Sequence, residues 1–280
     1  MTVTALMPVR TYHPDYLRES VDSLLAQTSP DWRLLGILDR IGRGGLEAVL
    51  GKRLDDPRIE LIANQGRKLA GAFNTGMRQA QSEFVAILLG DDMWEPNAVK
   101  VLLDNIGAHP EVDFFHSARR VVKEDGEPIS PVFPSRLSVT LEDFGPDSPV
   151  KHLLCWRREK ALSFGGMDER LNSVGPDDFD FPWCMAEHGA TFAHVPECLY
   201  VYRDHRSFSR LTTHLPLSVH IREIRRIHRK HGLDKAVTEH FLEEAREKYL
   251  RQCIYRSRID RWVKERLRVG RTTAWRETYW

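Results

Sequence analysis

The chain has 280 residues, of which 41% are hydrophobic and 29% charged, so it can bury a substantial core in one large domain or two small ones. A formal net charge of +1 argues against a general nucleic-acid-binding protein. No apolar run approaches the roughly 20 residues that span a bilayer, and the N-terminus lacks the basic region of a signal peptide, so we expect a cytoplasmic protein.

Strand-like and helix-like segments alternate through the first part of the chain. Apolar, β-branched runs predict strands over residues 2–9, 32–39, 58–64 and 83–90. Apolar residues at helical spacing predict helices over residues 14–27, 44–54, 69–81 and 96–109, the first of which opens with a proline. This alternation is typical of parallel βαβ units, so the sequence predicts a doubly wound α/β unit.

Polar residues follow each of the four predicted strands. In a doubly wound sheet the ligand crevice lies at the carboxyl ends of the strands. We therefore expect one rim to hold the segments that follow the strands: Pro8 to Thr11, Asp39 with Arg40, Asn64 to Lys68, and Asp91 with Asp92.

The fourth strand ends in two adjacent carboxylates, Asp91 and Asp92. Two neighbouring acids repel each other unless a divalent cation lies between them and a ligand. The patterns GxGxxG and GxxxxGK[ST] are absent, so a nucleotide bound here would need a cation for its phosphates. The alternative is a turn that leads into a helix N-cap before Pro96.

The pattern changes after Asp113. The segments "VDFFHS" and "RRVVKEDGEPI" predict antiparallel strands around a turn at Asp125 and Gly126. A second acidic cluster, "GPDDFD", precedes a helical stretch, and a later strand ends in "YRDHR". We expect one catalytic domain followed by a helical tail.

Four segments, in this order along the chain, resemble the inverting nucleotide-sugar glycosyltransferases of family 2. They are "MPVRTYHPDYLRESVDSLLAQTSPDWRLLGILD", "NQGRKLAGAFNTGMRQAQSEFVAILLGDDMWEP", "FGGMDERL" with "GPDDFDF", and "YVYRDHRSFS". The resemblance implies an α/β fold of the GT-A type, a mostly parallel, Rossmann-like doubly wound sheet with a C-terminal helical extension. It implies a catalytic domain over 1–214, with a nucleotide-sugar half (1–113) and an acceptor-side half (114–214), followed by a basic helical extension over 215–280.

This sequence departs from the family pattern at three positions. Leu89 stands where the Asp-x-Asp motif normally begins, Asp177 replaces the glutamate of the Glu-Asp motif, and Leu38 precedes Asp39 where the family has paired aspartates. The metal role would therefore fall to Asp91 and Asp92.

The resemblance and the strand ends together assign the site residues. Mn²⁺ or Mg²⁺ would be held by Asp91, Asp92 and His205, since hard oxygen ligands and neutral imidazole suit these ions. The predicted donor-binding residues are Pro8, Arg10, Thr11, Asp39, Arg67, Lys68, Asn74, Asp91, Arg203 and Arg206. Other interpretations stay open: His205 as a surface imidazole, Asp39 as a helix cap, and Arg67 and Lys68 as solvated charges.

The catalytic pair is predicted at Asp177 and Asp178. An acceptor hydroxyl is a poor nucleophile near neutral pH, so a carboxylate must take its proton. Both residues open a helix, where successive side chains point about 100° apart, so only one can face the anomeric carbon. We favour Asp178 as the base, with Asp177 binding the acceptor hydroxyls or orienting the loop.

The predicted activity is transfer of a sugar from a nucleotide-diphosphate donor, preferably a UDP-sugar, to an acceptor hydroxyl in bacterial glycan or glycosylated metabolite synthesis. The acceptor would be a carbohydrate, a lipid-linked molecule or a small molecule. One alternative is a nucleotidyltransferase, although "PVRTYHPDY" lacks the glycine-rich loop of that class. Another is an inactive sugar-nucleotide-binding protein, which Leu89 would favour.

The tail carries most of the positive charge. Residues 215–280 hold 17 Lys and Arg against 9 Asp and Glu, a surplus of +8. Three helices are predicted, with a break at Gly232 after the first and the third beginning near Ile254. We expect them to pack against the catalytic domain or a second copy in a homodimer. The alternative is peripheral contact with anionic lipid at the inner face of the membrane.

Overall fold

The computed structural model describes residues 1–129, 132–145, 148–150, 152–171, 175–205 and 216–256. The chain forms two compact units, one made of Met1–Phe144 with Ser148–Ser209 and the other of Gly145–Asp147 with Arg210–Trp280. The boundary predicted between residues 214 and 215 lies outside the described residues and stays a prediction.

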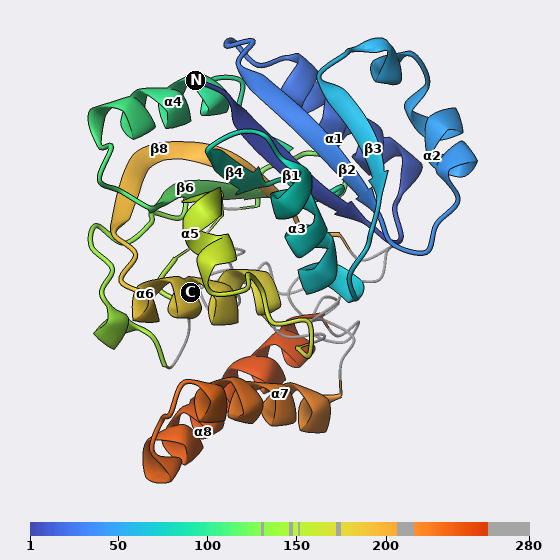
Figure 1. Ribbon diagram of the computed structural model, residues 1–280. Helices are drawn as coiled ribbons and strands as arrows, with labels where there is room; N and C mark the ends of the chain where they lie inside the picture. Colours follow the sequence, from blue (N-terminus) through green and yellow to red (C-terminus); the bar gives the residue numbers. More distant parts are fainter. Residues whose placement is uncertain (130–131, 146–147, 151, 172–174, 206–215, 257–280) are drawn as a thin grey trace. The chain divides into compact units, whose positions relative to one another are not determined.

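The larger unit is built on one eight-stranded sheet with the strand order β3-β2-β1-β4-β7-β6-β8-β5 (Figure 1). The strands are β1 (Val3–Val9), β2 (Trp32–Leu38), β3 (Ile59–Ala63), β4 (Phe84–Ile87), β5 (Met93–Trp94), β6 (Phe114–Val122), β7 (Leu154–Arg157) and β8 (Phe192–Arg203). Strands β1 to β4 are parallel, and β7 runs antiparallel between β4 and β6. The predicted α/β fold with a mostly parallel sheet is confirmed.

The helices that connect the parallel strands also match the sequence prediction. They are α1 (Pro14–Leu25), α2 (Arg43–Leu50), α3 (Lys68–Gln79) and α4 (Ala98–Ala108). Pro14 is the first helical residue of α1, where its fixed φ suits the helix and its missing N–H leaves no partner unsatisfied. Helix α2 is shorter than predicted, because Gly51 adopts a φ of +53° and the chain continues as a 3₁₀ turn over Gly51–Asp55.

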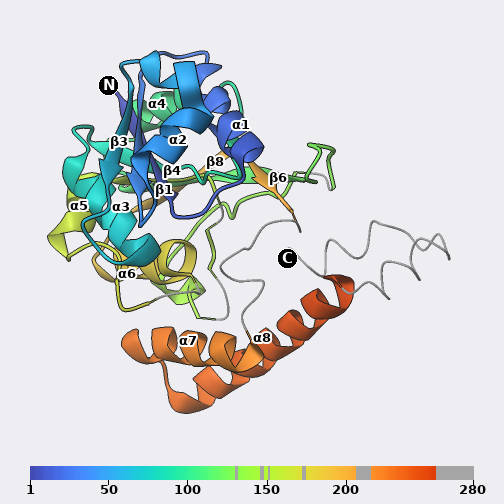
Figure 2. The same cartoon turned by 90° about the vertical axis from the view of Figure 1, so that its right-hand side faces the viewer.

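Two apolar clusters cover the two faces of this sheet. Buried side chains of α1, α2 and α4 pack in one cluster, and those of α3, α5 (Arg158–Ser163) and α6 (Phe181–Glu187) pack in the other. In the edge-on view of Figure 2, α3 lies on one side of the sheet and α1 on the other. Because both faces are buried, the central strands read as continuous apolar runs and not as alternating ones.

The predicted hairpin after Asp113 is wrong in its first part. The segments "FFHS" and "RRVV" belong to one strand, β6, which pairs in parallel with β8 and has an irregularity at Ala118. Strand β8 has 12 residues and pairs with β6 along the whole length of β6, so the two segments form one strand without a turn between them. The turn at Asp125 and Gly126 is present, with a φ of +84° at Gly126, and among the described residues after it the antiparallel pairing consists of isolated bridges.

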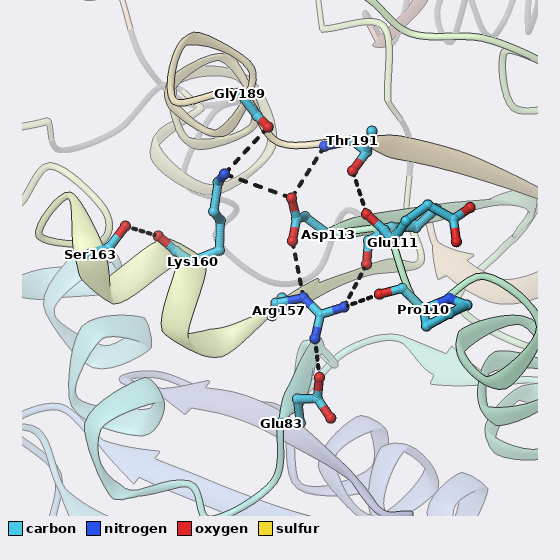
Figure 3. Close-up of polar contacts among 10 residues, drawn as sticks. Glu83, Pro110, Glu111, Asp113, Arg157, Lys160, Ser163, Gly189 and Thr191 are labelled. Atoms are coloured by element: carbon cyan, nitrogen blue, oxygen red, sulfur yellow. Dashed lines mark hydrogen bonds and ion pairs between the residues drawn. The ribbon is translucent and has the colours of Figure 1, made fainter.

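A polar cluster fastens β7 at the amino ends of β4 and β6 (Figure 3). The guanidinium of Arg157 donates to Oδ1 of Asp113 at 3.0 Å and to the carbonyl of Pro110 at 2.7 Å, and it also pairs with Glu83. Lys160 reaches Oδ2 of Asp113 at 3.8 Å. This cluster lies at the opposite ends of the strands from the predicted ligand rim, so we assign it to holding the antiparallel strand in the sheet.

The described part of the second unit contains two helices, α7 (Leu217–Lys230) and α8 (Lys235–Arg256), which pack against each other (Figures 1 and 2). Gly232, with a φ of +70°, lies in the predicted break. The prediction of a third helix beginning near Ile254 is wrong at its start, because that residue continues α8; residues 257–280 lie outside the described part of the chain. Among the described residues, no helix is long and apolar enough to cross a membrane.

Candidate active site

The two aspartates after β4 point to different partners. Asp92 is 1% exposed; its Oδ2 accepts a hydrogen bond from the hydroxyl of Tyr200 at 2.8 Å, and its Oδ1 accepts one from the N–H of Arg203, also at 2.8 Å. Burial, followed by the charge of Asp92, raises the pKa of the Tyr200 hydroxyl well above its ordinary value, so that the hydroxyl stays a donor. Asp92 therefore ties the end of β4 to β8.

Asp91 is the more exposed member of the pair and faces His205. Its side chain is 30% exposed, and its Oδ2 lies 2.9 Å from Nε2 of His205. The imidazole follows β8, is itself fully buried, and lies beside the ring of Tyr16 at a centroid distance of 5.4 Å. The interpretation of His205 as a surface imidazole is therefore wrong. The contact brings a carboxylate oxygen and an imidazole nitrogen from residues 114 positions apart to one point of the rim.

Arg203 is buried beneath this pair. It is 1% exposed, and its guanidinium donates to the carbonyl of Asp91 at 3.1 Å and to the carbonyl of Glu124 at 2.8 Å. It also pairs with the carboxylate of Glu19 and lies over the ring of Tyr16 at 4.5 Å. These contacts indicate that Arg203 holds the backbone of Asp91 in place; its predicted role as a donor ligand stays a prediction.

The ends of β1 and β2 bring a second set of predicted residues together. Pro8 pairs with Ile37 across the strands, and Nε of Arg10 lies 4.0 Å from Oδ2 of the buried Asp39. The N-cap of the following helix is Gly42 and not Asp39, so the helix-cap alternative for Asp39 is wrong. Thr11 is exposed at the same end of β1.

Side chains of the loop and of α3 hold the loop between β3 and α3. Oδ1 of Asn64 accepts the N–H of Gly66 at 2.8 Å, and Oγ1 of Thr75 accepts the N–H of Gln65 at 3.0 Å. Arg67 is exposed, and Lys68 adopts a left-handed φ of +60°, which is uncommon for a residue other than glycine. The two predicted phosphate-binding side chains thus extend from an ordered loop at the rim.

Asn74, a predicted donor-binding residue, is buried on α3. It is 3% exposed, and its amide bonds both backbone groups of Met167: Nδ2 donates to the carbonyl at 2.9 Å, and Oδ1 accepts the N–H at 2.8 Å. These bonds fix the segment "GGMDE" to α3, so Asn74 has a structural task in addition to its predicted role in donor binding. Arg206, the remaining predicted donor ligand, lies outside the described residues.

The second acidic pair lies in a π-helical turn, Pro176–Asp180, which leads into α6 and packs against α3. Asp177 is 7% exposed, whereas Asp178 is half-buried. Burial, assisted by the charge of Asp178, raises the pKa of Asp177 to about 8. Burial and the neighbouring charge thus favour the protonated form of Asp177, beside the more accessible Asp178. Gly175 begins the turn in a left-handed conformation, with a φ of +51°.

Sequence reasoning missed several residues that build the site. Tyr16 and Glu19 lie on one face of α1 and contact Arg203, and Tyr200 bonds Asp92 from β8. The available signal for Tyr200 was its place in the strand-like "YVYR" segment, because a tyrosine buried in a strand needs a hydrogen-bond partner for its hydroxyl. Glu169 is the fourth missed residue, and it accepts hydrogen bonds from α3.

Comparison with known proteins agrees with this architecture. The sequence model of Glycosyl transferase family 2 matches residues 4–152. The "O-antigen biosynthesis protein RfbC" of Myxococcus xanthus is 25% identical over 209 residues, which cover 72% of this chain and 16% of that protein. The Escherichia coli "UDP-Glc:alpha-D-GlcNAc-diphosphoundecaprenol beta-1,3-glucosyltransferase WfgD" is 34% identical over 101 residues, covering 35% of this chain and 38% of that one. This chain thus spans less than half of either relative.

Solved structures share the fold. The TarS fragment 1–349 from S. aureus, in complex with UDP-GlcNAc, superposes with a TM-score of 0.65 at 19% sequence identity and covers 96% of this chain and 76% of that one. The mannosyltransferase PcManGT from Pyrobaculum calidifontis, in complex with GDP-Man and Mn²⁺, gives a TM-score of 0.57 at 18% identity, covering 98% and 77%. With the family match extending over more than half of its length, the chain belongs to glycosyltransferase family 2, and it has the GT-A fold.

Proposed function

We propose that this chain transfers a sugar from a nucleotide-diphosphate donor, preferably a UDP-sugar, to an acceptor hydroxyl with inversion at the anomeric carbon. The contact between Asp91 and His205 carries this proposal: a carboxylate oxygen and an imidazole nitrogen, both suited to a divalent cation, lie 2.9 Å apart beyond the carboxyl ends of β4 and β8. The names of the relatives give support, because WfgD uses UDP-Glc and acts on a lipid diphosphate. The likeness to RfbC, an O-antigen biosynthesis protein, supports a role in bacterial glycan synthesis.

The residues after β4 and β8 fit Mn²⁺ or Mg²⁺. Asp91 supplies a carboxylate that is partly exposed, and Nε2 of His205 lies beside it, so these two would hold the ion. Asp92 was also predicted as a ligand, but we assign it to positioning, because its oxygens accept hydrogen bonds from Tyr200 and Arg203. A bound cation would neutralise the charge that develops on the leaving diphosphate.

The donor would lie along the ends of the first three strands. Asp39 would accept a hydrogen bond from the base or ribose of the nucleotide, and the nearby Arg10 would hold that carboxylate in place. Arg67 and Lys68 would contact the phosphates from their loop as charged donors.

Asp178 would serve as the base. It is the more accessible carboxylate of its pair, and the raised pKa of Asp177 keeps that neighbour neutral near pH 7. A neutral Asp177 can donate a hydrogen bond to the acceptor or the loop, while Asp178 takes the proton of the attacking hydroxyl. A base on the face of the sugar opposite the leaving group gives inversion by single displacement.

Calorimetry of UDP binding tests the proposal. We expect Mn²⁺ to strengthen UDP binding by the wild-type chain, because the sequence has no glycine-rich loop to cradle the phosphates. The Asp91→Asn variant should lose most of this metal-dependent gain and should retain its affinity in EDTA. Equal UDP affinity with Mn²⁺ and with EDTA in the wild-type chain would contradict the metal role.

Substitution of His205 separates phosphate contacts from base contacts. The His205→Ala variant should bind UDP more weakly by about tenfold, the effect expected for one strong polar contact, while its affinity for uridine should be unchanged because uridine lacks the diphosphate. Calorimetry with the two ligands measures both effects. Equal losses for UDP and uridine would assign His205 to the shape of the pocket and not to the diphosphate.

A further inference from the structure

A carboxylate from the acceptor side of the chain is inserted into the start of α3. Oε2 of Glu169 accepts the N–H of Arg67 at 2.8 Å, and Oε1 accepts Nδ2 of Asn74 at 3.0 Å. The residues that these bonds join are about a hundred positions apart in the sequence. The N-terminus of a helix presents unpaired N–H groups and a partial positive charge, so a carboxylate is the side chain that best satisfies it.

Two glycines make room for this carboxylate. A Cβ on Gly66 would lie 2.6 Å from the Cα of Gly71 and 2.8 Å from Oε1 of Glu169. A Cβ on Gly71 would lie 2.5 Å from the carbonyl carbon of Gly66 and 3.1 Å from Oε2 of Glu169. Neither glycine has a positive φ, so both are glycine because of space and not because of backbone conformation. The two glycines of "GRKLAG" therefore leave the space in which the Glu169 carboxylate lies.

A second point of attachment lies at Asn74, about two helical turns after Arg67. The amide of Asn74 bonds both backbone groups of Met167, and a Cβ on Gly166 would lie only 2.4 Å from its Oδ1. Gly166 also has a φ of +76°, which favours glycine. The segment 166–169 is thus held to α3 at two places by contacts that leave little freedom.

These contacts join the two sides of the proposed site. Arg67, whose N–H bonds Glu169, precedes Lys68, and the left-handed φ of Lys68 needs support from its neighbours. The segment 166–169 leads along the chain to Asp177 and Asp178, whose π-helical turn also packs against α3. We therefore expect a shift of the loop that carries Arg67 and Lys68 to displace the segment that carries Asp177 and Asp178 as well.

We propose that Glu169 is a positioning residue that fixes the loop 64–68 for the donor diphosphate and couples this loop to the segment that carries the base. The inference rests on the proposed function, since Arg67 and Lys68 are its phosphate contacts. Glu169 acts through the backbone of Arg67 and does not itself touch the donor. Its loss should therefore weaken recognition of the diphosphate and leave recognition of the nucleoside intact.

Calorimetry of Glu169 variants tests this. In the presence of Mn²⁺, Glu169→Ala should bind UDP about tenfold more weakly, as expected for loss of a hydrogen bond to a charged group, with the affinity for uridine unchanged. Glu169→Gln keeps the shape and one acceptor oxygen, so it should fold normally and show a smaller loss. Glu159→Ala is the matched control, because that side chain on α5 is 81% exposed, and it should bind UDP like the wild-type chain.

A double-mutant cycle excludes a general structural effect. In an Arg67→Ala/Lys68→Ala background, Glu169→Ala should cause no further loss of UDP affinity, because the loop no longer carries the phosphate contacts. Additive losses, or wild-type UDP affinity in both Glu169 variants, would overturn the positioning role while leaving the proposed function intact. If the wild-type chain bound none of UDP, GDP and TDP, the proposed function itself would be overturned together with this inference.

Discussion

The Asp178→Asn variant is expected to retain nearly all of its affinity for the donor and to lose roughly a hundredfold to ten-thousandfold in turnover, the range attributed to general base catalysis. Asparagine has almost the same shape as aspartate but cannot accept the proton of the attacking hydroxyl. Donor affinity should survive because the proposed metal and phosphate contacts lie at the ends of β1 to β4 and β8. Turnover with a common acceptor and calorimetry with UDP provide the two measurements.

The matched variant is Asp177→Asn. The burial that raises the pKa of Asp177 to about 8 keeps this group protonated near neutral pH, and asparagine reproduces a neutral hydrogen-bonding side chain. Asp177→Asn should therefore act mainly on the KM for the acceptor. The reverse pattern, in which Asp177→Asn abolishes turnover and Asp178→Asn stays active, would transfer the role of the base to Asp177.

The pH profile of activity distinguishes the two carboxylates further. As the pH rises through about 8, Asp177 loses its proton and places a second negative charge beside Asp178 inside a buried turn. We expect turnover of the wild-type enzyme to fall on this alkaline side, and Asp177→Asn to remove the fall. Because the folded-state pKa is raised, the stability linked to Asp177 is greatest below the ordinary pKa of aspartate and is lost as the pH rises towards 8.

Much of the fold follows from local patterns in the first half of the chain. Strands β1 to β4 and helices α1, α3 and α4 agree with the predicted spans to within a few residues, because buried parallel strands and amphipathic helices leave distinct hydrophobic periods. The single strand β6 could not be predicted in this way. Its continuity depends on pairing with β8, about 80 residues later, and the residues of β6 alone do not indicate this partner.

The site residues illustrate a similar division. Strand ends indicated Asp39, Asp91 and the "YRDH" segment, because the carboxyl ends of parallel strands share one rim. The sequence alone did not indicate which of Asp91 and Asp92 is the more exposed. Their side chains point to different partners, Tyr200 for Asp92 and His205 for Asp91, and both partners lie far away in the sequence. Glu169 was missed because its partner, the N–H of Arg67, is a backbone group without a sequence signature.

Arg203 allows a direct test of whether a residue in a family motif binds ligand or holds the protein together. The sequence predicted a donor ligand, yet the guanidinium donates to the carbonyls of Asp91 and Glu124 and lies over Tyr16. Glu19, its ionic partner, has a side chain that is 51% exposed, whereas that of Arg203 is 1% exposed, so solvent screens the pair only in part and the carboxylate compensates a buried charge. The two carbonyl contacts and the volume that the side chain fills add to this stabilisation.

We expect Arg203→Ala to reduce the free energy of unfolding by about 3 kcal/mol, because it leaves two carbonyls without their donor and opens a cavity under Asp91. Arg203→Lys should recover only part of this loss, since a single ammonium cannot reach both carbonyls and stack on Tyr16. Denaturant unfolding measures both variants. Arg43→Ala is the control, because Arg43 is 64% exposed in its ion pair with Glu47 and its removal should cost less than about 1 kcal/mol.

Ligand binding completes the test of Arg203. If Arg203 only positions Asp91, the folded fraction of Arg203→Lys should show a loss of UDP affinity in Mn²⁺ and none in EDTA, because the metal ligand moves while the phosphate contacts of Arg67 and Lys68 persist. A residue that contacted the diphosphate directly would instead weaken UDP binding equally in both conditions. Unchanged stability, together with an equal loss of UDP affinity in Mn²⁺ and in EDTA, would therefore refute the positioning role and identify Arg203 as a donor-binding residue. The reason is that a guanidinium that bonds buried carbonyls cannot be removed without a cost in stability.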